Sequence, residues 1–396
     1  MSIVGFFFCL PFAPYYIQDL GVTEPAAITL WASAYMAVAS LALALVAPVW
    51  GFLADRYGRR VMLLRANFAG AVILFLMGMA PNVETLIFLR FIQGMFGGTV
   101  PAAQALVASS TPDDRSGFAL GFLTSALFLG VMLGSFLGGL FAEYYGYRVS
   151  FTAASVILVI AGSIILFGVR EDFTRPESQR PLLEMRMREW VPKPGPAWPI
   201  FLLLMVLGTT RQFDNALFPL LVQDIIGSKE GAAFWTGTIM AGAGMAGFIS
   251  SIILGRLADR FTPAIIGRAS ASLSSALILP HALTSAITTL MGLRVGVTFF
   301  AAGLEPVMQA WLARITPRAH RGAAFGWAAS ARFIGWFIAP LISGTLASVF
   351  GLRSIYFVGS VLFLALIPLI NFVAGKLSEV ERQLKSEQER ENREQG

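Results

Sequence analysis

Long apolar runs, separated by short polar connections, make up almost the whole chain. A helix needs about 20 mostly apolar residues to cross the hydrocarbon core of a membrane. Because the runs are long and uniformly apolar rather than short and alternating, they predict membrane-spanning helices instead of barrel strands. Twelve segments qualify: 3–19, 28–53, 61–80, 84–108, 115–142, 149–170, 197–222, 233–257, 262–281, 285–310, 320–347 and 352–375. The expected fold class is therefore an all-α integral membrane protein with twelve transmembrane helices.

The placement of basic residues predicts how these helices are oriented. Of the 29 lysines and arginines, only Arg148, Lys229 and Arg353 fall in outer connections if the N-terminus is cytoplasmic. Most of the others fall in the inner connections and the tail, as the positive-inside rule requires. Both termini are thus expected to be cytoplasmic. The net charge of +6 reports topology and gives no reason to expect a nucleic-acid partner.

Composition excludes several classes of function. The chain of 396 residues is 56% hydrophobic and only 13% charged, whereas a soluble protein carries roughly a quarter charged residues. One cysteine, Cys9, and two distant histidines, His281 and His320, give no disulfide framework and no usual metal-ligand spacing. Both histidines fall at ends of predicted helices, where we expect them to be interfacial and inert. We expect no enzyme activity, no cofactor and no metal. The sequence also lacks the motif of a phosphate-binding loop, so ATP is not expected to be the energy source.

The second half of the chain repeats the first at an offset of 204–205 residues. The sequence at 51–57, GFLADRY, returns as GRLADRF at 255–261, and PYYIQD at 14–19 returns as PLLVQD at 219–224. Two six-helix bundles in the same membrane orientation are therefore expected, with a cavity between them that opens alternately to each side. The predicted units are a first bundle (1–170), a cytoplasmic linker (171–196), a second bundle (197–375) and a charged cytoplasmic tail (376–396). The first run lacks a signal-peptide pattern and is expected to remain.

Glycine, proline and charged residues form four motifs in the first half of the chain. The segment 51–60, GFLADRYGRR, lies between helices 2 and 3, Arg90, Gln93 and Gly94 lie in helix 4, and Pro11 and Pro14 lie in helix 1. These motifs resemble those of the major facilitator superfamily, in particular its drug:proton antiporter branch of bacterial multidrug efflux transporters, and the segment 51–60 fits the superfamily signature. The helix 5 antiporter motif of that branch is represented by Gly130, Gly134, Gly138 and Gly139, which allow close helix packing, but Ser135 replaces its proline.

The resemblance implies a conformational latch on the cytoplasmic side. In the family, the aspartate of the signature pairs with an arginine and a helix N-terminus of the opposite bundle. The residues in question here are Gly51, Asp55, Arg56, Gly58 and Arg59, with Asp259 and Arg260 as the weaker mirror latch. Alternatively, the arginines serve only as positive-inside charges.

Six charges fall within predicted spans, where each costs about 2.5–3.5 kcal/mol on an insertion scale. They are Arg90, Arg211, Asp214, Arg294, Glu305 and Arg332. Asp214 and Glu305 are candidate proton carriers, although Asp214 and Arg211 lie three residues apart and can also neutralise each other. The resemblance links Arg90 to proton coupling, with a structural clamp as the alternative.

The candidates for substrate binding are Tyr15, Gln93, Arg211 and Arg332. Four positive against two negative charges within the spans favour an amphipathic or anionic organic substrate.

The sequence leaves three functions open. The first is proton-coupled efflux of small organic compounds by alternating access, with the substrate and protons as partners. The second is proton-coupled uptake of a sugar, organic acid or nucleoside on the same fold. The third is an ion-independent lipid translocator or a receptor. In each case we expect a monomer in the bilayer of a bacterial inner membrane.

Overall fold

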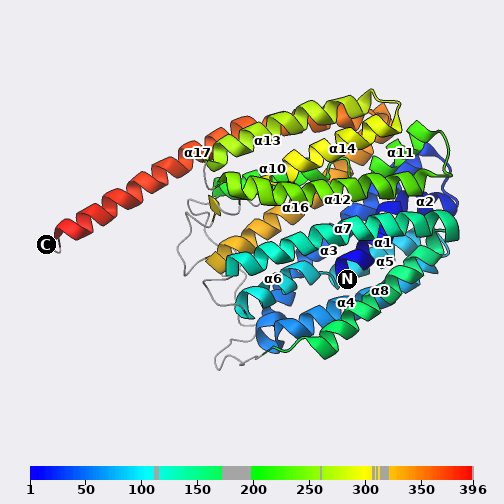
Figure 1. Ribbon diagram of the computed structural model, residues 1–396, viewed down its shortest axis with the longest axis horizontal. Helices are drawn as coiled ribbons and strands as arrows, with labels where there is room; N and C mark the ends of the chain where they lie inside the picture. Colours follow the sequence, from blue (N-terminus) through cyan, green and yellow to red (C-terminus); the bar gives the residue numbers. More distant parts are fainter. Residues whose placement is uncertain are drawn as a thin grey trace.

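The computed structural model describes residues 1–110, 116–171, 198–258, 261–305, 308, 311–312 and 321–394, and this part is built of helices. Figure 1 shows them running roughly side by side along one direction, with the C-terminal helix extending beyond the others. The main helices are α1 (Ser2–Cys9), α2 (Ala13–Asp19), α3 (Pro25–Tyr57), α4 (Arg59–Gly78), α5 (Val83–Met95), α6 (Thr99–Ser110), α7 (Ser116–Tyr145), α8 (Tyr147–Gly168), α10 (Trp198–Gln212), α11 (Phe218–Ile226), α12 (Ala232–Ala258), α13 (Pro263–Ile278), α14 (Ile287–Ala302), α16 (Arg321–Phe350) and α17 (Ser354–Glu394).

Within the described residues, eight helices are long and apolar enough to cross a membrane. Two of the other predicted spans are divided into shorter helices. The predicted span 3–19 consists of α1 and α2 joined by the 3₁₀ turn Leu10–Phe12, and 197–222 consists of α10 and α11. In addition, α14 is a shorter apolar helix of 16 residues. All-helical architecture is thus observed, while the number of twelve spans stays a prediction.

The breaks in the predicted spans have local causes. Pro11 and Pro14 stand at the starts of the 3₁₀ turn and of α2, and proline removes the backbone N–H that a continuous helix needs. Pro219 takes the same place at the start of α11. Between α5 and α6, Gly98 has a φ of +105°, which favours glycine. The repeat-related helix pairs α1–α2 and α10–α11 therefore break at corresponding points.

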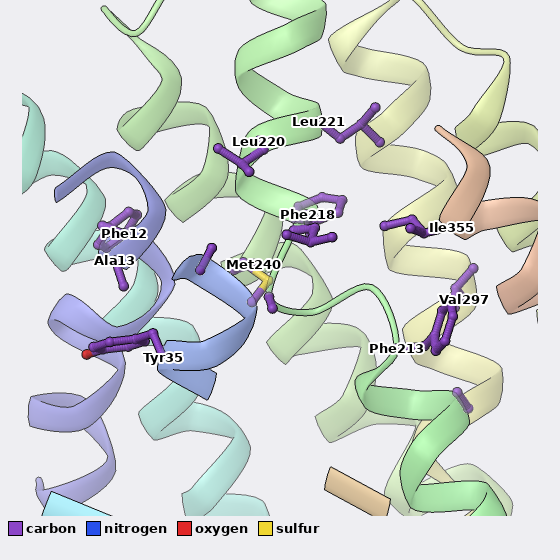
Figure 2. Packing of buried hydrophobic residues seen from close by; sticks show 14 of the residues in the cluster. Phe12, Ala13, Tyr35, Phe213, Phe218, Leu220, Leu221, Met240, Val297 and Ile355 are labelled. Carbon is purple, nitrogen blue, oxygen red and sulfur yellow. The ribbon is translucent and has the colours of Figure 1, made fainter. Parts of the chain in front are cut away.

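Each half of the chain packs mainly on itself, and the two halves meet along two long helix pairs. In the first half α4 packs on α8 and α1 on α7, and in the second half α10 packs on α16 and α13 on α17. The halves meet where α7 lies against α12 and α3 against α16. Buried side chains from both halves belong to one cluster, of which Figure 2 shows Phe12 and Ala13 from the first half and Phe213 and Phe218 from the second.

Glycines allow the closest approaches between helices. A Cβ atom at Gly130, Gly134 or Gly138 would collide with residues 3–8 of α1, so these three positions form the groove in which α1 lies. A Cβ atom at Gly139 would lie 2.7 Å from the carbonyl oxygen of Ala233 in α12. The glycines predicted to form a packing motif therefore contact two different helices, one in each half of the chain.

Candidate functional site

Two adjoining cavities lie beside the break between α10 and α11. The first has a volume of about 200 Å³ and takes apolar wall residues from both halves, among them Phe7, Phe128 and Val131 of the first half and Met240 and Phe363 of the second. Its polar end consists of Thr210, Arg211, Gln212, Asp214, Asn215, Arg294 and Thr298. The second cavity, of about 220 Å³, shares Arg211 and Gln212 and adds Leu204, Leu207, Gly208, Glu305, Arg332 and Trp336.

The helix break explains why polar side chains reach these cavities. Helix α10 ends at Gln212, and residues 213–217 form turns before α11 begins. The backbone N–H groups of Leu217 and Phe218 both donate to the carbonyl oxygen of Asp214, which satisfies part of the interrupted backbone. Phe213, Asp214, Ala216 and Leu217 of this turn are buried, and Asp214 and Asn215 line the first cavity.

Asp214 pairs with Arg294 of α14. The Nη1 atom of Arg294 lies 2.5 Å from Oδ2 of Asp214, and the two side chains are 9% and 4% exposed. The guanidinium also lies 4.4 Å from the centre of the Phe218 ring. Because both charges are almost fully buried, each depends on the other for compensation.

Glu305 lies between two arginines. Its Oε2 atom accepts from Nη1 of Arg211 at 2.9 Å, and its Oε1 atom accepts from Nη1 of Arg332. The structure thus gives Arg211 and Asp214 different partners rather than pairing them with each other. Around the two cavities, the described residues include three arginines and two acids, an excess of one positive charge.

Arg90 occupies a different environment in the first half. Its side chain is 7% exposed. Its Nε atom donates to the carbonyl oxygen of Tyr35 at 3.2 Å, its Nη1 atom donates to Oε1 of Gln93, and its guanidinium lies 4.6 Å from the centre of the Tyr35 ring. These partners are all neutral, so in the described residues no acid compensates Arg90 as Asp214 compensates Arg294.

Tyr15 connects the two halves. It is fully buried, and its hydroxyl donates to the carbonyl oxygen of Pro219 at 2.6 Å and lies 2.8 Å from Oγ1 of Thr236. The two glutamines Gln18 and Gln223 exchange hydrogen bonds in both directions, at 2.9 and 3.1 Å. This group of contacts, with the ion pair of Lys229 and Asp19, lies at the end of the molecule away from the C-terminus (Figure 1).

Much of the predicted cytoplasmic latch lies outside the part of the chain that the structure describes. This applies to the residues Asp259 and Arg260, to the side chain of Asp55 and to the surroundings of Gly51. Arg56 is described, and its guanidinium lies 5.8 Å from the centre of the Tyr57 ring. Gly58, with a φ of +92°, ends α3 and precedes α4.

Sequence reasoning missed the residue that caps α4. The carboxylate of Glu171 accepts from the backbone N–H of Arg59 at 2.9 Å and of Arg60 at 2.8 Å. A carboxylate is stabilised at the positive end of a helix dipole, so Glu171 fixes the start of α4 to the end of the first half. A separation of 112 residues left no local signal for this pairing.

His281 is packed inside the protein. It is fully buried, its ring stacks on Tyr356 with a centroid distance of 5.3 Å, and its Nδ1 atom lies 3.0 Å from the carbonyl oxygen of Leu277. The sequence placed it at a helix end, and the 3₁₀ turn Leu279–Ala282 folds it inward. His320 lies outside the described residues.

Comparisons with known proteins give consistent similarities. A family model for the Major Facilitator Superfamily matches residues 1–288 and 264–394. Multidrug resistance protein MdtG of Proteus mirabilis is 32% identical over 365 residues, which are 92% of this chain and 90% of that protein. MdtG of Escherichia coli is 32% identical over 362 residues, 91% of this chain and 88% of the relative.

Solved structures agree on the fold. A bacterial homologue of the human lysosomal transporter Spinster, in an inward-facing and unoccupied conformation, has a TM-score of 0.74 at 14% identity and covers 96% of this chain and 95% of its own. The nucleoside transporter NupG has a TM-score of 0.74 at 11% identity, covering 94% of this chain and 98% of its own. At such low identity, these two likenesses concern the fold alone.

Proposed function

Because the chain belongs to the major facilitator superfamily, we propose that it exports small amphipathic organic compounds from the cytoplasm by proton-coupled alternating access. One observation carries this proposal: the cavity beside α10 and α11 has apolar walls from both halves and a charged end from the second half. Such a lining suits a molecule with an apolar body and a polar group. The relatives named as multidrug resistance proteins support export of drugs.

The charges around the cavities suggest how substrate and proton are handled. Glu305 and Asp214 are the two acids, and each forms an ion pair with arginine. Glu305 is the better placed of the two, because its side chain is 21% exposed whereas that of Asp214 is 4% exposed. We assign proton exchange with the cavity to Glu305. Arg211 and Arg332, which leave one positive charge in excess, favour an anionic group on the substrate.

The arrangement in the membrane is part of the same proposal. We place twelve helices across a bacterial inner membrane as two bundles, residues 1–170 and 197–375, with both termini in the cytoplasm and the protein as a monomer. The contacts of Tyr15 and Gln18 then close the outer side. The family's signature loop, which includes Gly58, then lies on the inner side. Its latch role, through Asp55 with Asp259 as the mirror residue, is proposed from the family resemblance.

Transport in inverted membrane vesicles tests the direction and the energy source. With the vesicle interior acidified, a fluorescent amphipathic compound is expected to accumulate inside vesicles that contain the protein, and a protonophore is expected to abolish the accumulation. Vesicles without the protein serve as the control. Accumulation only in right-side-out vesicles, with their exterior acidified instead, would favour uptake, and accumulation that persists with the protonophore would contradict proton coupling.

Replacing Glu305 by glutamine tests its assignment as the proton-exchanging group. Glutamine keeps the size of the side chain but binds no proton in this pH range, so proton-driven accumulation is expected to fall by at least about tenfold, equivalent to about 1.4 kcal/mol. Exchange of labelled for unlabelled compound at equal pH needs no net proton movement and is expected to persist. Asp224→Asn, at an exposed acid that pairs with Arg353 away from the cavities, is the matched control. Loss of exchange and accumulation together would assign Glu305 a structural role.

A further inference from the structure

Glycines of α12 lie against α7 where the two halves meet, and Figure 1 shows these helices side by side. A Cβ atom at Gly237 would lie 2.5 Å from a backbone atom of α7, and one at Gly244 would lie 3.1 Å from another. A Cβ atom at Gly247 would instead lie 2.5 Å from Cε1 and 2.7 Å from Cδ1 of the Phe128 ring. At Gly237 and Gly244 the backbones of the two helices therefore touch, whereas at Gly247 a side chain of α7 occupies the space that glycine leaves.

The Phe128 ring is part of the wall of the first cavity. The residues of α12 that line this cavity are Met240, Ala243 and Gly244. Gly247 is next on the same face of α12, because residues three and four apart lie on one side of a helix. The hydroxyl of Tyr15 lies 2.8 Å from Oγ1 of Thr236, one turn before these residues. Phe128 therefore forms the part of the α7–α12 wall that is furthest from Tyr15.

The first cavity is small for the compounds that the proposed function assigns to it. Its volume is about 200 Å³, whereas pockets for drug-sized ligands measure roughly 300–1,000 Å³. A larger compound therefore needs a part of the wall that can move. The backbones of α7 and α12 are in contact at Gly237 and Gly244, so the helices cannot approach or turn freely there. The half-buried Phe128 can change its position by rotation about its side-chain bonds.

We propose that Phe128 sets the upper size of the compounds that the first cavity accepts, and that Gly247 is the residue that positions its ring. With glycine at position 247 the ring lies against α12 and leaves the cavity open. A side chain at this position displaces the ring towards the cavity, because the close-packed helices leave it no other space. This inference rests on the proposed function, since it names what limits the substrates of the same site. It concerns the apolar body of a compound and not the charge of its polar group.

Binding of compounds of graded size tests this assignment. The full-length protein in lipid nanodiscs is titrated with the 2-sulfonates of naphthalene and anthracene, and with the 2-trimethylammonium compounds of the same two ring systems. Gly247→Ala is expected to weaken anthracene binding at least about tenfold relative to naphthalene binding, because the overpacking is relieved at the expense of the cavity. Phe128→Leu is expected to strengthen anthracene binding about threefold or more relative to naphthalene binding, because the removed ring leaves apolar space that a ligand ring can fill. Both shifts are expected with either charged group.

A double variant shows whether the two residues act on each other. Leucine at position 128 leaves room for the Cβ atom added at position 247. In Gly247→Ala with Phe128→Leu, the ratio of anthracene to naphthalene affinity is therefore expected to return to within about threefold of the wild type. Gly292→Ala, whose added Cβ atom has no neighbour within 4 Å, is the matched control for the glycine. Phe122→Leu, at an exposed phenylalanine of α7, is the control for the ring, and both controls are expected to keep the wild-type ratio.

The size dependence separates this role from a structural one. Equal weakening of naphthalene and anthracene binding in Gly247→Ala would mean that the helices shift as a whole, and it would overturn the inference. An unchanged ratio in Phe128→Leu would overturn it as well, and this variant decides alone if Gly247→Ala does not fold. Absence of binding of all these compounds to the wild type would also overturn it. Only the vesicle experiment decides whether the protein exports compounds, so the inference and the proposed function can fail separately.

Discussion

Replacing Arg294 by methionine is expected to lower the free energy of unfolding by about 3–5 kcal/mol, because the substitution leaves Asp214 buried without its partner. The ion pair has a separation of 2.5 Å and both side chains are less than one tenth exposed. Methionine is similar in length to arginine and fits an apolar surrounding, so the effect reports the lost charge more than lost volume. Unfolding by increasing denaturant in detergent micelles, followed by tryptophan fluorescence, measures it.

A double variant separates the charge from the packing. Asp214→Asn with Arg294→Met has no buried charge to leave uncompensated, so its stability is expected to recover most of the loss of Arg294→Met alone. Arg268→Met, at an exposed arginine that bonds only Asn371 in the described residues, is the control and is expected to cost less than about 1 kcal/mol. If the double variant is as unstable as Arg294→Met, packing rather than charge determines the effect.

Replacing Gly237 by alanine is expected to prevent the two halves from closing at the Tyr15 end and to reduce transport by at least about tenfold. A Cβ atom at Gly237 would lie 2.5 Å from the carbonyl oxygen of Ser135 and 3.0 Å from the Cα atom of Gly139. Both are backbone atoms of α7 that move only with the helix. Overpacking of this kind costs about 1–3 kcal/mol, and here the cost falls on the closed arrangement alone.

The rate at which an introduced cysteine is labelled measures whether the two halves close at the Tyr15 end. In the background of Cys9→Ser, Gln223→Cys at the interface is expected to react faster with a membrane-impermeant maleimide when Gly237→Ala is also present. Gly292→Ala is the matched control. Like Gly237, Gly292 is part of an apolar helix, but no atom lies within 4 Å of a Cβ atom added to Gly292. Unchanged labelling in Gly237→Ala would mean that α7 and α12 shift without opening this end.

The family and the general architecture could be predicted from sequence, because they depend on local or repeated patterns. The signature at 51–60 identified the superfamily that the comparisons confirm, and the apolar runs predicted helices throughout. The positions at which helices are interrupted were harder to predict. Hydrophobicity averaged over a span does not register a break such as 213–217, because two polar residues, Asp214 and Asn215, lie within a run that is otherwise apolar.

The partners of the charged residues could not be read from the chain. Spacing along a helix suggested Arg211 with Asp214, but Arg211 meets Glu305 and Asp214 meets Arg294, 94 and 80 residues away. Such pairings depend on how helices rotate and cross, which a hydrophobic pattern fixes only loosely. The one long-range signal in the sequence was the repeat, and it relates Gln18 to Gln223 as well as Arg90 to Arg294.

The paired amides of Gln18 and Gln223 show what becomes possible when one sequence pattern occurs twice in a chain. An amide carries its own donor and acceptor, so two identical side chains that face each other complement one another without any further substitution. Two copies of a lysine or a glutamate would repel each other at the same place. A repeated pattern thus yields a contact between its copies directly where the side chain is self-complementary, whereas a charged side chain needs a different residue in one of the copies.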